Sequence, residues 1–362
     1  MQRRAMCAGV LGLMLAASGC SEEKPPVAAA GSVGPQGPAG EPGPAGPPGA
    51  PGVRLLYGDG SSGEHVVSSD ATLDPSELLF TDFTVEAGAT LTVPSGTVLR
   101  CTGTFTNRGT IVVQPYAAGG TLRTVLIEGY PQVKPAHPGL AASSASLGTV
   151  ATLGSSAYGS AGGVGLGEAR ARSVRIVGPE GGGGGGGRDS WPGGAGGGTL
   201  TVLAQGPLVN EGSIQANGSS TPGGASVGGG GGGVLVLASA TRIMNSGALR
   251  AAGAPGSPAL KEPSGNWGLG GGGGGGGGLI VAVSPILEGA GGLSVSGGAG
   301  GAPAGTLAAG ATGRGGGGGG GASVGEGGWG GGVGAGAGNV EAGLPGAAGA
   351  IVTRLHDPAL VL

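Results

Sequence analysis

Acidic side chains are the residues of this chain that could support catalysis or metal binding. Paired Asp or Glu residues can act as acid and base in glycoside cleavage, and clustered carboxylates can hold calcium. Between residues 97 and 298 the sequence has seven scattered acids: Glu128, Glu168, Glu180, Asp189, Glu211, Glu262 and Glu288. In the repeat alignment given below, Glu211 falls beside Arg108 and Glu288 beside Met244, so no carboxylate pair forms. We therefore predict a protein that is not an enzyme and has no cofactor and no metal site.

Other catalytic motifs are explained by the abundance of glycine. The pattern G-x-S-x-G occurs at 224–228 and 321–325, but a nucleophile elbow needs a strand before the serine and a helix after it, and here polyglycine follows or precedes it. The three histidines are far apart in the sequence, and three lysines give no phosphate-binding loop. The formal charge of −3 gives no reason to expect nucleic-acid binding.

Cys20 lies at the end of an export-signal pattern. Arg3 and Arg4 precede an apolar segment that is too short to span a bilayer, and the segment closes as LAASGC. This ending resembles the lipobox of bacterial lipoproteins, although Ala17 stands where that family usually has leucine. The resemblance implies lipidation of Cys20, anchoring in membrane lipid, and localisation at the outer membrane or cell surface. The alternative is an ordinary signal peptide with a coincidental cysteine.

Residues 31–54 form eight uninterrupted Gly-X-Y triplets. The glycines in phase are Gly31, Gly34, Gly37, Gly40, Gly43, Gly46, Gly49 and Gly52. Only glycine fits at the axis of a collagen triple helix, so this period predicts a stalk roughly 70 Å long, at about 3.1 Å per residue. The segment resembles the stalks of bacterial collagen-like surface proteins, which implies a homotrimer. The alternative is a monomeric polyproline II spacer.

A strand-rich segment recurs without gaps at 200–218, 235–253 and 279–297, with a fainter copy at 97–115. Its apolar columns are Leu99, Val202, Leu237 and Val281; Phe105, Leu208, Ile243 and Leu287; and Ile111, Ile214, Leu249 and Leu293. A glycine column follows at Gly109, Gly212, Gly247 and Gly291, and Asn107, Asn210 and Asn245 precede it in three copies. Asn and Gly tolerate left-handed backbone, so these columns predict corners. Such ladders predict an all-β β-solenoid and resemble the parallel β-helix family; a β-sandwich is the alternative.

Glycine and proline are 96 and 26 of the 362 residues, which excludes a mainly helical protein. Four glycine runs, 181–187, 228–233, 270–278 and 315–321, start 47, 42 and 45 residues apart, and we expect each to be the return limb of one repeat. Polyglycine can form a threefold extended helix that bonds laterally to its neighbours. The runs resemble those of glycine-rich phage tail-fibre adhesins and glycine-rich antifreeze proteins. The alternative is flexible loops.

The three tryptophans, Trp191, Trp267 and Trp329, each lie within eight residues of a glycine run. They are candidate contact aromatics for a surface polysaccharide or a protein ligand, although pinning of the glycine stack is an alternative role. A lone Cys101 in the strand-rich region is expected to be a small buried hydrophobe. Together these patterns predict a lipid-anchored, surface-displayed structural or adhesive protein. The alternatives are a carbohydrate-active β-helix protein, either a lyase or hydrolase or a sugar binder, and a protein that binds ice or crystal surfaces.

The organisation expected from these patterns has six segments. They are a signal peptide (1–19), a lipidated tether (20–30), the collagen-like stalk (31–54), N-terminal β-rich coils (55–115), an irregular Ala/Ser/Gly insertion (116–180) and glycine-rich solenoid repeats (181–362).

Overall fold

The computed structural model describes residues 56–74, 78–127, 130–134, 181–187, 191–259, 270–304, 320–321, 324–331 and 341–362. The chain divides into two compact units, Met1–Pro51 and Gly52–Leu362, and every described residue belongs to the second. The predicted signal peptide, Cys20 and the collagen-like glycines therefore lie outside the described residues.

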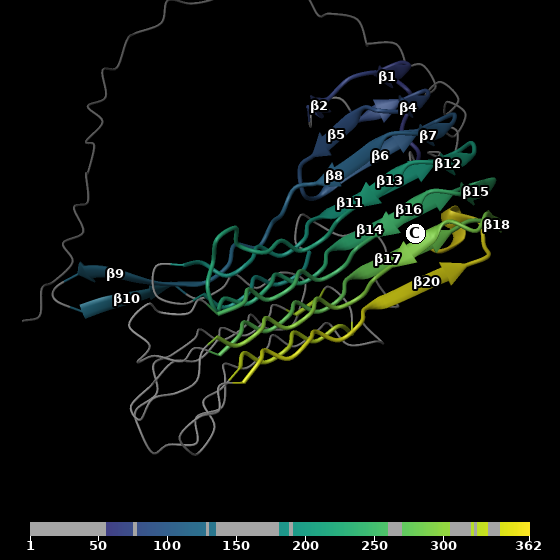
Figure 1. The fold of residues 1–362 in the computed structure, drawn as a ribbon. Helices are drawn as coiled ribbons and strands as arrows, with labels where there is room; N and C mark the ends of the chain where they lie inside the picture. The colour runs from purple at the N-terminus through teal and green to yellow at the C-terminus, as the bar shows by residue number, and fades with distance from the viewer. Residues whose placement is uncertain are drawn as a thin grey trace, which may run out of the picture. The chain divides into compact units, whose positions relative to one another are not determined.

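Three six-stranded sheets, all with parallel pairing, make up the strand-built part (Figure 1). Sheet A contains β1 (His65–Val67), β4 (Phe83–Val85), β7 (Phe105–Asn107), β12 (Leu208–Asn210), β15 (Arg242–Asn245) and β18 (Ile286–Glu288). Sheet B contains β2 (Ala71–Thr72), β5 (Thr90–Val93), β8 (Thr110–Val113), β13 (Ser213–Gln215), β16 (Ala248–Arg250) and β19 (Gly292–Ser294). Sheet C contains β3 (Leu79–Phe80), β6 (Thr97–Cys101), β11 (Thr199–Ala204), β14 (Val234–Ser239), β17 (Leu279–Val283) and β20 (Ala350–Arg354).

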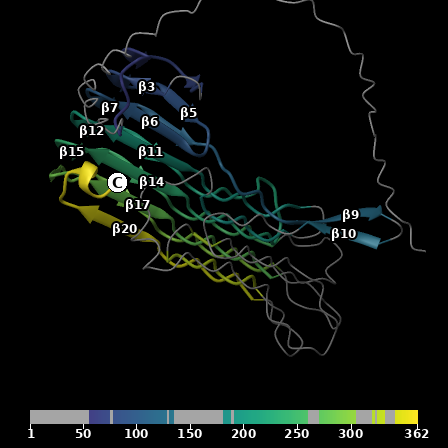
Figure 2. The ribbon, with the colours of Figure 1, turned by 180° about the vertical axis from the view of Figure 1, so that it is seen from behind.

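The chain visits sheets C, A and B in turn, so each coil contributes one strand to each sheet, as Figures 1 and 2 show from opposite sides. This is a parallel β-helix-like solenoid, as predicted, and the parallel pairing argues against a β-sandwich. Strands of two to six residues close the coil around one apolar core, and most of those in the first coils alternate buried and partly exposed side chains. The N-terminal end of this core is aromatic: Phe83 stacks on Phe105 with ring centroids 5.7 Å apart and contacts Phe80 at 4.9 Å.

Two of the three predicted apolar columns are confirmed by the strand register. Phe105, Leu208, Ile243 and Leu287 pair in sheet A, and Ile111, Ile214, Leu249 and Leu293 pair in sheet B.

The first column is wrong at its last member, because Leu237 pairs with Ala282 and not with Val281. Ile243 follows Leu237 by six positions, whereas its partner Leu287 follows Ala282 by five, so the last corner is one residue shorter. An ungapped alignment cannot represent this deletion.

Val281 instead faces outward, into a second core on the far face of sheet C. This core contains Val236 and Val283, and Leu56 and Leu362 from the two ends of unit 2 pack against it. The middle strands of sheet C, β11 and β14, are therefore buried on both faces, which explains the unbroken apolar run of β14.

Each corner glycine stacks on the corner glycine of the neighbouring coil, which confirms the predicted column. The reason is not left-handed backbone, however, because neither these glycines nor the asparagines have positive φ. A Cβ on Gly212 would collide with the Gly109 carbonyl oxygen, and one on Gly247 with that of Gly212. Glycine is required here for close approach of stacked backbones.

Glycine-rich segments continue the coils beyond the strands (Figure 1). The inbound limbs, which lead into sheet C, are 191–198, 228–233, 270–278 and 341–349. The outbound limbs, which leave sheet B, are 116–120, 216–219, 251–259 and 295–302. Two flanking limbs, 181–187 and 324–331, pack against the inbound limbs through backbone hydrogen bonds. We call these limbs together the glycine bundle.

The bundle is ordered by hydrogen bonds that repeat every three residues. From limb 270–278, the N–H groups of Gly271, Gly274 and Gly277 donate to Glu341, Leu344 and Ala347 of the next inbound limb. The N–H groups of Gly272, Gly275 and Gly278 donate to Ser257, Ala254 and Ala251 of an outbound limb. The carbonyl oxygens of the third set of residues, Gly273 and Gly276, accept hydrogen bonds from the N–H groups of Gly229 and Gly232 in another inbound limb. This is the period of the threefold polyglycine helix, which therefore describes the limb better than a flexible loop does.

The predicted equivalence of the four glycine runs is wrong. Runs 228–233 and 270–278 are both inbound limbs, but run 181–187 is a flanking limb antiparallel to 191–198, with Gly182 and Gly185 donating to Gly197 and Gly194. Of run 315–321 only residues 320–321 are described, and the Gly320 carbonyl accepts from Gly183. The near-regular spacing was coincidental, because the true offsets between coils vary widely.

Those offsets follow from the register of sheet C. They are 21, 103, 35, 45 and 71 residues, from Phe80↔Cys101, Cys101↔Ala204, Thr199↔Val234, Val234↔Leu279 and Leu279↔Ala350. The longest offset contains the segment predicted as an irregular insertion. Its described part comprises the outbound limb 116–120 and an antiparallel pair, β9 (Thr121–Ile127) and β10 (Tyr130–Lys134).

Candidate binding surface

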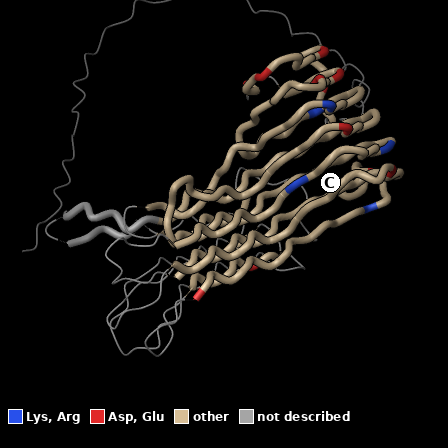
Figure 3. Tube along the Cα trace, viewed as in Figure 1, with Lys and Arg blue, Asp and Glu red and all other residues tan. Residues whose placement is uncertain are grey.

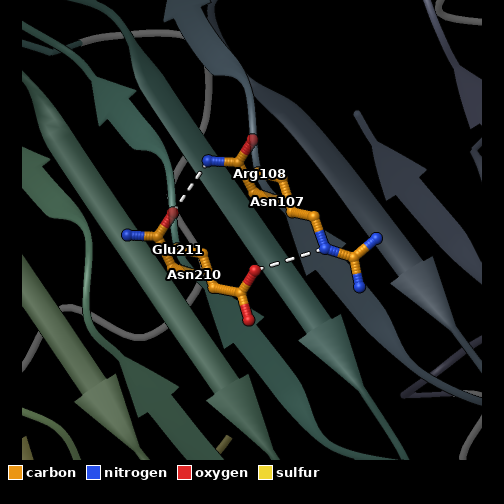
Figure 4. Close-up of polar contacts among 4 residues, drawn as sticks. All are labelled: Asn107, Arg108, Asn210 and Glu211. Carbon is orange, nitrogen blue, oxygen red and sulfur yellow. Dashed lines mark hydrogen bonds and ion pairs between the residues drawn. The ribbon is translucent and has the colours of Figure 1, made fainter. Parts of the chain in front are cut away.

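The corner between sheets A and B holds a ladder of asparagine side chains. Asn107 donates from Nδ2 to Oδ1 of Asn210 at 2.8 Å (Figure 4). Asn210 donates in the same way to Oδ1 of Asn245 at 2.7 Å. Asn107 and Asn210 are fully buried and cannot bond to water. The ladder supplies the partners that Asn107 Nδ2 and both polar atoms of the Asn210 side chain need. The sequence marked these positions as corners but gave no sign that their side chains bond along the coils.

The two described carboxylates near this ladder lie beside an arginine and a methionine. Arg108 Nε lies 3.2 Å from Glu211 Oε2, with both side chains half exposed, an arrangement that contributes at most about 1 kcal/mol to stability. The stacking of Glu288 on Met244 is confirmed. The other five of the seven acids lie outside the described residues, so the carbohydrate-active alternative stays a prediction. Within the described ranges, no three His, Cys, Asp or Glu side chains gather to hold a metal ion.

Ser226 is the described serine of the G-x-S-x-G patterns. It is buried with φ of 57°, preceded by a turn at Gly223 and followed by limb 228–233, so the strand and helix of a nucleophile elbow are not its neighbours. Ser323 lies outside the described residues.

Cys101 is fully buried in the core between the sheets, as expected. Burial, with a smaller effect from Asp82, raises the pKa of its thiol to about 12, so the thiol is protonated and unreactive at neutral pH.

The two described tryptophans are exposed on the bundle. Trp191 begins an inbound limb and is 42% exposed, and Trp329 lies in a flanking limb and is 49% exposed. Trp267 lies outside the described residues. The glycines beside Trp329, from Gly327 to Gly331, are buried, so the indole stands on a surface made of backbone. Exposure of both rings favours the contact role over the alternative of pinning the stack.

Trp329 lies beside limb 341–349. Its carbonyl oxygen accepts from the N–H of Leu344 at 2.7 Å, and Leu344 is 56% exposed. The carbonyl of Glu326, one helical turn away, accepts from Ala347 at 2.7 Å. Charged residues are concentrated in the strand-built part, whereas the limbs are uncharged for most of their length (Figure 3).

No protein-family model, no curated protein and no solved structure significantly matches this chain. A search of the described ranges for helices long and apolar enough to cross a membrane gave none.

Proposed function

We propose that this chain is a lipid-anchored, surface-displayed structural or adhesive protein and carries out no chemical reaction. The observation that carries the proposal is the display of Trp191 and Trp329 on a bundle whose glycine surroundings are held by backbone hydrogen bonds. Large aromatic side chains on such a scaffold lose little conformational entropy on binding, which suits a contact surface.

The other parts of the proposal rest on sequence. A lipid at Cys20 would anchor the chain at the outer membrane or cell surface, and the stalk from Gly31 to Arg54 would trimerise and raise the head above it. The ligand of the head would be a surface polysaccharide or protein.

The anchor is tested by comparing Cys20→Ala with Cys101→Ala as a matched control. We expect the first variant to lose palmitate labelling and to leave the membrane fraction, and the second to keep both. Cells carrying the wild-type chain should also attach to a coated surface better than cells carrying Cys20→Ala. Palmitate labelling that persists without Cys20 would contradict the anchor.

The trimer is tested by light scattering of the lipid-free Cys20→Ala chain. A mass three times that of the 33.2 kDa chain is expected, and a monomer at micromolar concentration would rule the trimer out.

Binding to ice or crystal surfaces is a second candidate, favoured by the outer face of sheet B. Aligned hydroxyl side chains project there in two rows, one of Thr90, Thr110 and Ser213 and one of Thr72 and Thr92. Neighbouring members of a row lie on strands about 4.8 Å apart, a regular lattice of hydroxyl groups. Thermal hysteresis of the purified chain is the test, and its absence at high protein concentration would exclude this candidate.

A further inference from the structure

Two antiparallel limbs at the C-terminal side of the bundle place five side chains on one exposed strip. We call Glu326, Trp329, Glu341, Leu344 and Ala347 the Trp329 strip. Limb 324–331 and limb 341–349 are joined by the hydrogen bonds from Leu344 to Trp329 and from Ala347 to Glu326. The strip is therefore held by backbone contacts on both sides.

The spacing of these residues follows the threefold helix. Residues three positions apart share a face of such a helix, so Glu326 lies on the face of Trp329, and Glu341 and Ala347 lie on the face of Leu344. All five residues are exposed, whereas the described glycines between Glu326 and Trp329 are buried. The side chains thus appear only on the faces where the bundle meets solvent.

Charge is arranged symmetrically about the aromatic ring. Trp329 is level with Leu344, Glu326 lies one turn to one side of the pair, and Glu341 lies one turn to the other. At about 3.1 Å per residue, the two carboxylates are about 19 Å apart along the strip. The described residues of the glycine bundle include no Lys or Arg, so no cation there opposes these two acids.

We propose that the Trp329 strip binds an extended basic peptide segment of a partner protein. Its Lys or Arg side chains would meet Glu326 and Glu341, and the segment between them would pack on Trp329 and Leu344. An extended peptide rises about 3.3 Å per residue and its side chains alternate between two faces, so cations six residues apart share one face and match the two carboxylates. A cation over the Trp329 face would add a cation–π contact. This inference rests on the proposed adhesive function and names the partner class of its surface.

The test is a calorimetric titration of the full-length chain with a synthetic oligolysine peptide and, as control, an oligoglutamate of equal length. We expect Trp329→Ala and the double variant Glu326→Gln with Glu341→Gln each to weaken oligolysine binding about tenfold, a loss within the range of a cation–π or charge contact. Tyr116→Ala is the matched control, because Tyr116 is an exposed aromatic residue of another limb, and the affinity of this variant for oligolysine should be unchanged. Added salt should weaken the wild-type interaction.

Three outcomes would overturn the inference: no oligolysine binding, equal binding by the strip variants and the wild type, or an equal loss in Tyr116→Ala. Tighter binding of a neutral oligosaccharide than of oligolysine would also overturn it, in favour of a sugar ligand. Hydrogen exchange of the bundle in each variant separates lost contacts from lost structure. If oligolysine does not bind but the Cys20 anchor and surface attachment are intact, the inference fails and the proposed function stands. If oligolysine binds but the chain is not anchored, the inference stands and the proposed function fails.

Discussion

The strand-built part and the glycine bundle solve the same packing problem with different atoms. In the strands, side chains such as Phe105 and Leu208 stack on one another and are excluded from water. In the bundle, the backbone itself is the packing surface, and a Cβ on Gly275 would collide with the Gly230 carbonyl oxygen. The strands therefore depend on hydrophobic burial and the bundle on close approach of hydrogen-bonded backbones. Substitutions that remove side-chain atoms should therefore destabilise the strand-built part, and substitutions that add atoms should destabilise the glycine bundle.

Removal of a core ring is expected to have the largest effect. Phe105→Ala should lower the free energy of unfolding by about 3–5 kcal/mol, because it leaves a cavity beside Phe83 and Leu208. Urea unfolding measures this loss. Thr106→Ala, a change at the outward-facing neighbour in β7, is the control and should cost far less. Similar losses in both variants would show that β7 is not anchored by its inner face.

Addition of one methyl group inside the bundle is expected to cause the second-largest loss in the free energy of unfolding. Gly275→Ala is expected to cost about 1–3 kcal/mol, since the limb is enclosed and cannot move away. Gly292→Ala is the matched control, because nothing lies within 4 Å of a Cβ there. Hydrogen exchange should show faster opening of limbs 228–233 and 270–278 while the sheets stay protected. Equal tolerance of both substitutions would mean that the bundle is loose.

Interruption of the asparagine ladder tests the junction between the two kinds of packing. Asn210→Ala leaves Asn107 Nδ2 with only the longer bond to the Ser213 carbonyl oxygen, 3.4 Å, and leaves Asn245 Oδ1 without its Asn210 donor, so a loss of about 1–2 kcal/mol is expected. Arg108→Ala, at the neighbouring exposed ion pair, should cost less than 1 kcal/mol. Urea midpoints of the two variants compare them directly, and a larger loss for Arg108→Ala would reverse this ranking.

Alkaline pH should also weaken the strand core, by an amount that grows with the distance of the pH above 9. The pKa of the Cys101 thiol is about 12 in the folded chain against an ordinary value of 9.0, so the unfolded chain loses this proton first. The stabilisation is complete below about pH 9 and falls as pH rises towards 12, by about 1.4 kcal/mol per unit at most. Cys101→Ala should show a shallower decline in urea-unfolding stability over this range. A decline of the same slope in both chains would assign the effect to other groups, such as Tyr57, whose pKa burial also raises to about 12.

The sequence was informative where side chains recur at a constant distance from the corner. The columns through Ile243 and Leu249 were predictable because inward-facing positions must be apolar in every coil. The pairing of Ala282 was not, since Val281 and Ala282 are both apolar and a buried outer face removes the alternation that would separate them.

The glycine runs were harder to interpret for a related reason. A glycine has no side chain that would indicate which neighbours it packs against. Runs 181–187 and 270–278 therefore have the same sequence pattern, although one is a flanking limb and the other an inbound limb. The candidate strip could have been found from the three-residue spacing of Glu326 and Trp329, but its pairing with Leu344 depends on a contact between separate limbs. The sequence drew attention to the tryptophans, and the structure shows that Trp191 and Trp329 are exposed.

The threefold helix restricts the changes in length that a limb can accept to multiples of three residues. Each residue added to a limb rotates everything beyond it by about a third of a turn, so one or two extra residues before Glu326 would turn this side chain inward and glycine outward. Three extra residues would restore every face and lengthen the limb by about 9 Å. Insertions or deletions of three residues would therefore change the length of the bundle while the same residue types stay exposed on its surface.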